Sequence, residues 1–282
     1  MENEKENGGQ SKRALILWHS YLSGDISQLD SMTMMVRQVF KRLPSAPRCK
    51  VCNAPFQGLG GMVVKIFGFG AGRSSFNPTL CDRCEVLVKH YQVGTEVPLT
   101  LLFADVRGST ALAEEIGASA FHHLINRFYT VSTQILIQTN ALIEKMIGDE
   151  VAGMYVPGIA GPDHARIAVD AAQTLMEATG HAGGGDPWIR VGVGIHTGTG
   201  YVGAVGSRQS VSDITVLGDV ANTTARLASQ AGAGEILISE EACRAANLSE
   251  DHRENRLLQL KGRSQAMPVQ VIRYLNKDTS AR

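Results

Sequence analysis

The spacing of apolar positions separates a helical N-terminal part of the chain from a mixed C-terminal part. Residues 1–12 are polar and carry no periodicity, which predicts a disordered tail. Residues 13–44 are predicted to be a helical segment, because apolar side chains recur three and four positions apart between Met32 and Leu43. Pro44 follows directly and is expected to end the helix.

The pattern changes twice more along the chain. Residues 45–94 hold four cysteines and six glycines between Gly58 and Gly72, so long regular elements are not expected there. Residues 95–275 alternate short apolar runs with helical periodicity, and residues 276–282 form a polar tail. Strands are expected near 99–103, 141–147, 150–156, 188–195, 201–206, 211–217, 235–238, 256–260 and 269–275. Helices are expected near 110–138, with an interruption at Gly117, near 163–178, from 219 and over 240–246.

This mixed order of hairpins and helices predicts an α+β domain with helices packed on a largely antiparallel sheet. The dipeptide Gly148-Asp149 separates two strand-like runs, which is typical of a β-hairpin. Asp149 therefore lies at a hairpin tip, while Asp105 follows the buried run 99–103. If the two strands are neighbours, both carboxylates converge on one edge of the sheet.

Composition narrows the class of protein. The chain has 282 residues, with 27 basic and 27 acidic side chains, so its net charge favours neither nucleic acid nor a membrane surface as a partner. No apolar run approaches the 18 or so residues of a membrane-spanning helix, and the acidic N-terminus does not resemble a secretory signal. We therefore expect a cytoplasmic protein, in which cysteines serve as metal ligands or free thiols more often than as disulfides.

Four of the five cysteines form a paired pattern. Cys49 and Cys52 are separated by two residues, and so are Cys81 and Cys84. Such pairs can close a tetrahedral shell around Zn²⁺, although the intervening loop is longer than in the common zinc-knuckle pattern. We interpret residues 45–94 as a zinc-ribbon-like module with a structural metal. An iron centre or a redox-active thiol set remains open as an alternative.

The two aspartates suggest a second metal site. Paired carboxylates suit hard cations such as Mg²⁺, with phosphate oxygens and water completing the coordination. The backbone N–H groups of Gly108, Ser109 and Thr110 would open a helix N-terminus towards the same place, where a phosphate group can bind. Taken singly, Asp105 or Asp149 would more often be an ordinary turn or cap residue than a metal ligand.

Four sequence motifs in a fixed order favour the metal-binding interpretation of the two aspartates. Residues 101–110 read LLFADVRGST, residues 144–149 read EKMIGD, residues 215–227 read TVLGDVANTTARL and residues 260–263 read LKGR. In type, order and separation these motifs resemble the class III nucleotidyl cyclases, the family of adenylyl and guanylyl cyclases. The resemblance covers about residues 96–275 and implies a ferredoxin-like βαββαβ catalytic domain. It does not extend to the cysteine module.

The resemblance implies a role for each matching position. Asp105 and Asp149 correspond to the two metal-binding aspartates, which together hold two Mg²⁺ or Mn²⁺ ions per active site. Lys145 and Thr215 correspond to the positions that read the base. Asn222 and Arg226 correspond to the pair that orients the ribose and stabilises the transition state. Lys261 corresponds to a lysine that binds the triphosphate, and Arg208 to a further phosphate ligand by a weaker alignment.

The chemistry of these residues fits such roles. A lysine ammonium at position 145 donates to N1 of adenine, an acceptor, whereas N1 of guanine carries a hydrogen. Asn222 and Arg226 are four residues apart and share one face of a helix. A guanidinium at position 226 suits the charge that develops on an α-phosphate during transfer.

The sequence thus predicts an adenylate cyclase that converts ATP into 3′,5′-cyclic AMP and pyrophosphate. One complete set of motifs in one chain implies a homodimer formed through the cyclase domain, with two equivalent sites. A catalytically silent cyclase-like domain that binds a nucleotide or a partner is the alternative. A third possibility, nucleic-acid binding by the basic cysteine module, has little support from its modest aromatic content.

Overall fold

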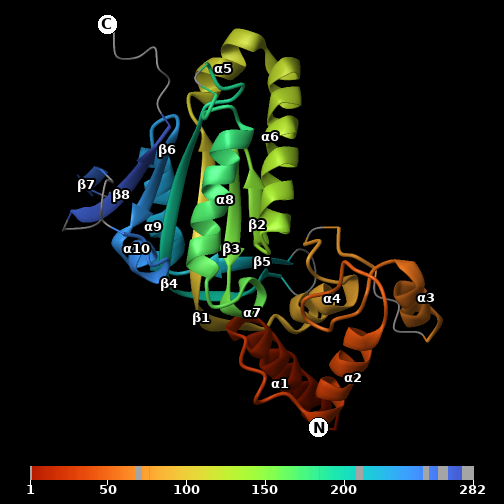
Figure 1. Ribbon diagram of the computed structural model, residues 1–282. Helices are drawn as coiled ribbons and strands as arrows, with labels where there is room; N and C mark the ends of the chain where they lie inside the picture. Colours follow the sequence, from red (N-terminus) through yellow and green to blue (C-terminus); the bar gives the residue numbers. More distant parts are fainter. Residues whose placement is uncertain are drawn as a thin grey trace, which may run out of the picture. The chain divides into compact units, whose positions relative to one another are not determined.

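The computed structural model describes residues 2–67, 72–75, 77–183, 185–207, 212–249, 254–259 and 266–274. The chain forms two compact units (Figure 1). Unit 1 comprises residues 1–97, 156–161 and 201–216. Unit 2 comprises residues 98–155, 162–200 and 217–282. Residues 201–216, which the sequence groups with the catalytic domain, cluster with the N-terminal part.

Helix α1 (Glu2–Ser23) provides much of the core of unit 1. It buries Ala14, Trp18, Tyr21 and Leu22, which lie on one face of the helix. The indole Nε1 of Trp18 donates to the carbonyl of Val202, at 3.0 Å, so its buried polar atom is satisfied. The same helix contacts α4 (Asp82–Tyr91) and the short α7 (Pro157–Ala160).

The remaining N-terminal helices surround the four cysteines. Helix α2 (Ser31–Arg42) begins at Asp30, whose carboxylate accepts a hydrogen bond from the Thr33 amide at 2.9 Å. Helix α3 (Gly58–Ile66) follows the first cysteine pair, and α4 begins at the second. Unit 1 also contains β5 (Ser212–Leu217), which pairs with β4 (Val191–Gly206).

Unit 2 is built on a mixed sheet in the order β2-β3-β1-β4-β6-β8-β7. Its strands are β1 (Gly94–Val106), β2 (Leu142–Ile147), β3 (Glu150–Tyr155), β4, β6 (Glu235–Ser239), β7 (Glu254–Leu258) and β8 (Met267–Arg273). Strands β1 and β4 begin or end in unit 1. The first four strands have the order and helix connections of a ferredoxin-like βαββαβ core, which confirms the predicted fold class.

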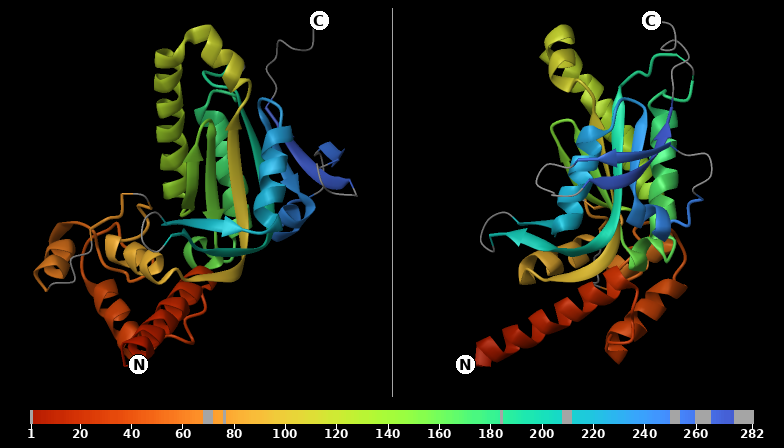
Figure 2. Two further views of the ribbon diagram at one scale, coloured as in Figure 1. Left: turned by 180° about the vertical axis from the view of Figure 1, so that it is seen from behind. Right: turned by 90° about the vertical axis from the view of Figure 1, so that its left-hand side faces the viewer.

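Helices cover both faces of this sheet. Helix α5 (Ser109–Ile116) and helix α6 (Ala118–Gln138) connect β1 to β2, and α6 packs against β2, β3 and α8 (His164–Ala178). Figure 2 shows α8 on one face and α9 (Asp219–Gln230) on the other. The short α10 (Glu240–Ala245) contacts α8, β6 and β8. Helix α8 contacts β3, and four alanines are among its buried residues: Ala165, Ala168, Ala171 and Ala172.

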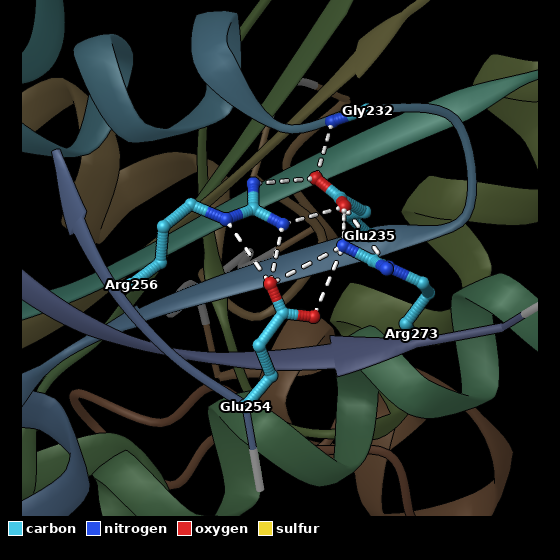
Figure 3. A network of polar contacts seen from close by, with 5 residues as sticks. All are labelled: Gly232, Glu235, Glu254, Arg256 and Arg273. Carbon is cyan, nitrogen blue, oxygen red and sulfur yellow. Dashed lines mark hydrogen bonds and ion pairs between the residues drawn. The ribbon is translucent and has the colours of Figure 1, made fainter.

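A polar network joins the three last strands (Figure 3). The carboxylate of Glu235 on β6 accepts hydrogen bonds from Arg256 on β7, at 2.9 and 3.1 Å, and from Arg273 on β8, at 2.8 Å. Glu254 pairs with both guanidinium groups. These charge-assisted hydrogen bonds hold the pKa of Glu235 down to about 2, with the Arg256 contact the main cause.

Three sequence expectations differ from the structure. Helix α1 begins at Glu2, where a disordered tail was expected, and Tyr91 supports this part of it by a hydrogen bond to Gln10. The segment 13–44 is broken into two helices, because Gly24 has a φ of 81° and Asp30 caps a new helix. Residues 188–206 hold one strand of 16 residues, β4, in place of two short strands.

The hairpin at Gly148 and the helix break at Gly117 are confirmed. Helix α5 starts at Ser109, one residue before the expected start near 110, and Gly108, with a φ of 69°, is its N-cap. Among the described residues, no helix is both long and apolar enough to cross a membrane.

Candidate active site

The pairing of β1 with β3 brings Asp105 and Asp149 together. The strands are antiparallel, with Asp105 opposite Glu150. The amide of Val106 donates to the carbonyl of Asp149 at 3.1 Å, so the end of β1 is joined directly to the tip of the β2–β3 hairpin. Gly148 has a φ of 65°, which favours glycine and fixes the turn that presents Asp149.

The electrostatics of this pair suit a cation. The pKa of Asp105 is raised because its carboxyl group is partly buried, and the charge of Asp149 raises it further. Two neighbouring carboxylates repel one another unless a positive charge lies between or beside them, and the Arg107 guanidinium is one such charge beside Asp105. The donor set of two hard oxygen ligands at a strand end therefore fits Mg²⁺ or Mn²⁺.

The first turn of α5 lies beside Asp149. Ser109, Thr110, Gly148 and Asp149 all line one cavity of about 720 Å³, together with residues of α6 such as Tyr129. The hydroxyl of Tyr129 donates to the Gly148 carbonyl at 2.8 Å, which braces the hairpin tip. The first backbone N–H groups of α5 have no partner within the helix and lie next to the carboxylates. They can bind a phosphate group that is coordinated to a metal ion.

Arg107 links this edge to helix α9. Its guanidinium forms an ion pair with the Asp105 carboxylate and donates to the backbone carbonyls of Ser229, at 2.9 Å, and Ala231, at 3.4 Å. Those carbonyls lie at the C-terminal end of α9, where a cation is favourable. Arg107 thus orients Asp105 and fixes the helix that carries Asn222 and Arg226. The sequence analysis missed this role, although the position of Arg107 two residues after Asp105 was a usable signal.

Lys145 lies on β2 between two carboxylates. Its Nζ is 3.6 Å from Glu150 Oε1 and 3.8 Å from Glu144 Oε2, and it lies over the ring of Phe103 at 5.2 Å. Burial raises the pKa of Glu150, and the Lys145 charge opposes that shift. Glu144 and Glu150 were not recognised as site residues from the sequence. They flank Lys145 in space and restrict where its ammonium group points.

Helix α9 places Asn222 and Arg226 on its outer face. Asn222 is exposed and Arg226 half-buried, while Val220, Thr223 and Leu227 are buried on the opposite face. Within the described parts of the chain, no contact joins Asn222 or Arg226 to Asp105 or Asp149. The two predicted groups of site residues therefore stay separate within one chain.

The other predicted residues lie elsewhere. Thr215 is half-buried on β5, which belongs to unit 1, whereas the aspartates and Lys145 belong to unit 2. Lys261 and Arg208 lie outside the described residues. Lys261 falls in the segment between β7 and β8.

The four cysteines of unit 1 come together as the sequence predicts. The Sγ atoms of Cys49, Cys52, Cys81 and Cys84 all lie within 4.8 Å of one another, and the Cys52–Cys81 distance is 3.8 Å. A tetrahedral Zn²⁺ site with bonds of about 2.3 Å has sulfur–sulfur distances of about 3.8 Å. The set therefore fits a tetrahedral metal ion.

Local backbone geometry builds this cluster. Asn53, with a φ of 64°, closes the turn after the first pair, and its amide donates to the Cys49 carbonyl at 2.9 Å. Cys81 is the N-cap of α4, and its Sγ accepts from the Cys84 amide at 3.4 Å. The Cys81 amide in turn donates to Cys49 Sγ at 3.3 Å. Amide donors to sulfur stabilise thiolates, the form that binds metal. The fifth cysteine, Cys243, is buried far from the cluster in sequence, on α10.

Comparison with known proteins identifies the family. Residues 92–274 match the family described as "Adenylate and Guanylate cyclase catalytic domain". The chain belongs to this family, since the match covers more than half of it. The match begins after the last of the four clustered cysteines.

Relatives of both kinds are similar to this chain. An adenylate cyclase of Anabaena cylindrica is 28% identical over 192 residues, which are 62% of this chain and 36% of the relative. The receptor-type guanylate cyclase gcy-6 of Caenorhabditis elegans is 30% identical over 150 residues, which are 51% of this chain and 13% of the relative. The chain spans about a third or less of the length of these relatives.

A solved structure agrees with the fold. The adenylyl cyclase CyaB from P. aeruginosa is 29% identical with a TM-score of 0.55, covering 64% of this chain and 95% of that one. The guanylyl cyclase Cya2, at 24% identity and a TM-score of 0.53, supports the fold alone.

Proposed function

We propose that this protein is an adenylate cyclase that converts ATP into 3′,5′-cyclic AMP and pyrophosphate. The observation that carries the proposal is the convergence of Asp105, Asp149 and the first turn of α5 at one edge of the sheet, in a chain of the cyclase family. Two carboxylates beside a helix N-terminus can hold a metal-bound triphosphate.

In this proposal, Asp105 and Asp149 hold two Mg²⁺ or Mn²⁺ ions. When bound, the ions lower the pKa of the ribose 3′-hydroxyl and neutralise charge on the phosphates. The amides of Gly108, Ser109 and Thr110 orient the triphosphate, with Lys261 as a further cation. Arg226 donates to the α-phosphate as its charge rises, and Asn222 holds the ribose. Positioning and charge stabilisation supply most of the rate acceleration in such a transfer.

The choice of ATP over GTP rests on Lys145 and Thr215. The Lys145 ammonium, held by Glu144 and Glu150, donates to adenine N1. Thr215 contributes a hydroxyl that can accept from the adenine amino group. A guanine ring offers a donor at N1, which the ammonium group would oppose.

The proposal includes a homodimer. Asn222 and Arg226 are on the outer face of α9 and do not contact the aspartates of their own chain among the described residues. A second copy would bring its Asn222 and Arg226 to the aspartates of the first, which gives two equivalent sites. The four-cysteine cluster holds a structural Zn²⁺ in this picture, since a closed shell leaves no ligand position for substrate.

The test is product formation by purified, metal-replete protein. The wild type and Asp105→Asn are incubated separately with ATP and with GTP, in Mg²⁺ or Mn²⁺, and cyclic nucleotides are quantified. We expect cyclic AMP from ATP, and a loss of at least about a hundredfold in the variant, since one metal ligand is neutralised. Glu115→Asn, an exposed change on α5, serves as the matched control.

Two other outcomes would contradict parts of this proposal. Cyclic GMP as the main product would mean that the roles given to Lys145 and Thr215 are wrong. No cyclic nucleotide from a folded dimer would favour the silent, nucleotide-binding alternative, which nucleotide binding by calorimetry would then identify.

A further inference from the structure

Helix α3 exposes the side chains that a helix normally buries. Its inner face consists of Gly60, Gly61 and Val64, all buried. A Cβ added at Gly60 would lie 2.0 Å from the Pro44 carbonyl oxygen, so only glycine permits this close approach. The helix therefore lies flat on the chain around the first cysteine pair, and its large side chains must point elsewhere.

Those large side chains face solvent. Leu59, Met62, Ile66 and Phe67 are 72%, 61%, 71% and 72% exposed, and Val63 is 36% exposed. Their spacing of three and four residues puts them on one continuous face. Figure 1 shows α3 at the edge of unit 1. Exposed apolar side chains that gather on one face mark a site of interaction.

Helix α2 of the same unit also exposes large apolar side chains. Its Met32, Met35 and Val39 are 73%, 59% and 50% exposed, again at helical spacing. Only Phe40 of this helix is buried. We call the exposed faces of α2 and α3 together the apolar faces of unit 1.

The charge of the surrounding segment is uniformly positive. Residues 31–81 contain no acidic residue and seven basic ones, although the whole chain is neutral. The seven are Arg37, Lys41, Arg42, Arg48, Lys50, Lys65 and Arg73. Arg37 donates to the Val51 carbonyl, and Arg48 donates to the carbonyls of Phe40 and Asn53. Lys41, Arg42, Lys50 and Lys65 are exposed.

From this combination we infer that the apolar faces of unit 1 bind the surface of a bilayer that contains anionic lipid. Apolar side chains beside cations match the acyl and headgroup layers of such a surface. A second copy of this chain is disfavoured, because the contact would bring the exposed cations of one copy against those of the other. Nucleic acid would satisfy the cations but leave Leu59, Met62 and Ile66 without apolar partners.

The experiment is sedimentation of the full, metal-replete chain with lipid vesicles. One set contains phosphatidylcholine alone and the other phosphatidylcholine with phosphatidylglycerol. We expect binding to the anionic vesicles that weakens as salt is raised. Ile66→Asp should lose at least tenfold in affinity. Lys50→Gln and Lys65→Gln together should lose about fivefold per cation removed.

Leu257→Asp is the matched control, because Leu257 on β7 of unit 2 is 71% exposed, like Ile66. It should bind vesicles like the wild type. The inference is overturned if the wild type does not sediment with anionic vesicles, or if Ile66→Asp binds as well as the wild type. Binding to duplex DNA without vesicle binding would identify a nucleic-acid surface instead. Dissociation of an oligomer by Ile66→Asp, without vesicle binding, would identify a contact between copies.

Discussion

At the scale of single residues, Lys145 is proposed to read the base, and the structure defines its surroundings. Its ammonium group lies within 4 Å of two carboxylates and over the Phe103 ring, at 3.6, 3.8 and 5.2 Å respectively. These neighbours limit the rotamers of the Lys145 side chain. A donor with a fixed position binds its acceptor more tightly than a mobile one, because less side-chain entropy is lost on binding.

We predict that Lys145→Gln lowers cyclic AMP formation by about tenfold to a hundredfold, since one charged hydrogen bond is worth about 1.5–3 kcal/mol. The loss should appear in kcat/KM measured with ATP. Lys12→Gln, an exposed change on α1, should have no effect. Equal activity of Lys145→Gln and wild type would remove Lys145 from the base-binding site.

At the scale of elements, the cysteine cluster supports the hairpin that carries Thr215. Helix α4 begins at Cys81, and its C-terminal end holds the β4–β5 hairpin. Lys89 Nζ is 3.5 Å from Asp213 Oδ1, and Gln92 Nε2 donates to the Gly206 carbonyl at 2.7 Å. Asp213 precedes Thr215 by two residues on the same strand. An ordered cysteine cluster therefore also helps to hold Thr215, the residue proposed to read the base, in position.

We therefore predict that loss of the cluster metal loosens this hairpin. After chelation, or in Cys81→Ser, amide hydrogen exchange over residues 201–207 and 212–217 should speed up by at least about tenfold. Exchange over the β2–β3 hairpin should stay unchanged. Cys243→Ser, which changes the cysteine outside the cluster, is the control. Unchanged exchange at the β4–β5 hairpin after verified metal loss would disprove the coupling.

The Glu235 network provides a second element-scale prediction, for pH. In the folded state the pKa of Glu235 is about 2, against an ordinary value of 4.5. A depressed carboxyl pKa stabilises the fold above the ordinary value, and this stability is lost as pH falls from about 4.5 towards 2. Glu235→Gln should therefore be about 2 kcal/mol less stable at neutral pH.

Denaturant unfolding of the wild type and of Glu235→Gln at a series of pH values tests this prediction about stability. The difference between wild type and Glu235→Gln should shrink as pH falls through the window from about 4.5 to 2. Glu115→Gln, whose side chain is exposed on α5, should show no such difference. A gap between wild type and Glu235→Gln that stays constant with pH would mean that the network does not act through the charge of Glu235.

At the scale of the whole molecule, the proposed homodimer can be tested by combining chains that carry different substitutions. The aspartates and the Asn222–Arg226 face are separate within one chain among the described residues, and in the proposed homodimer each site takes its aspartates from one copy and its Asn222 and Arg226 from the other. Asp105→Asn and Asn222→Ala should each be inactive alone. An equal mixture should recover about a quarter of wild-type activity, because half of the dimers are mixed and each has one intact site of two.

Recovered activity after subunit exchange is the measurement. A mixture of Asp105→Asn with Asp105→Asn,Asn222→Ala should remain inactive and serves as the control. No recovery in the first mixture, with exchange verified by labelled subunits, would show that each chain works alone.

The local features of the candidate site could be predicted from the sequence, because each of them is formed by residues close together along the chain. The Gly148-Asp149 turn predicted the hairpin, since the turn geometry is local. The cysteine spacing predicted that four thiols would meet. Arg107, Glu150 and Tyr129 could not be assigned in the same way, because their contacts with Ser229, Lys145 and Gly148 depend on how distant elements pack.

The sequence by itself determined the fold class, the metal-binding aspartates as candidates and the pairing of the cysteines, since periodicity, turns and motif spacing are properties of neighbouring residues. Only the tertiary structure decided that Asp105 lies opposite Glu150 beside Asp149 and that α9 turns Asn222 outward. It alone decided that α3 buries glycines and exposes its large apolar side chains. Which side chains are buried depends on which surfaces pack together. The pattern of apolar residues along a helix does not show which face of the helix packs against the rest of the protein.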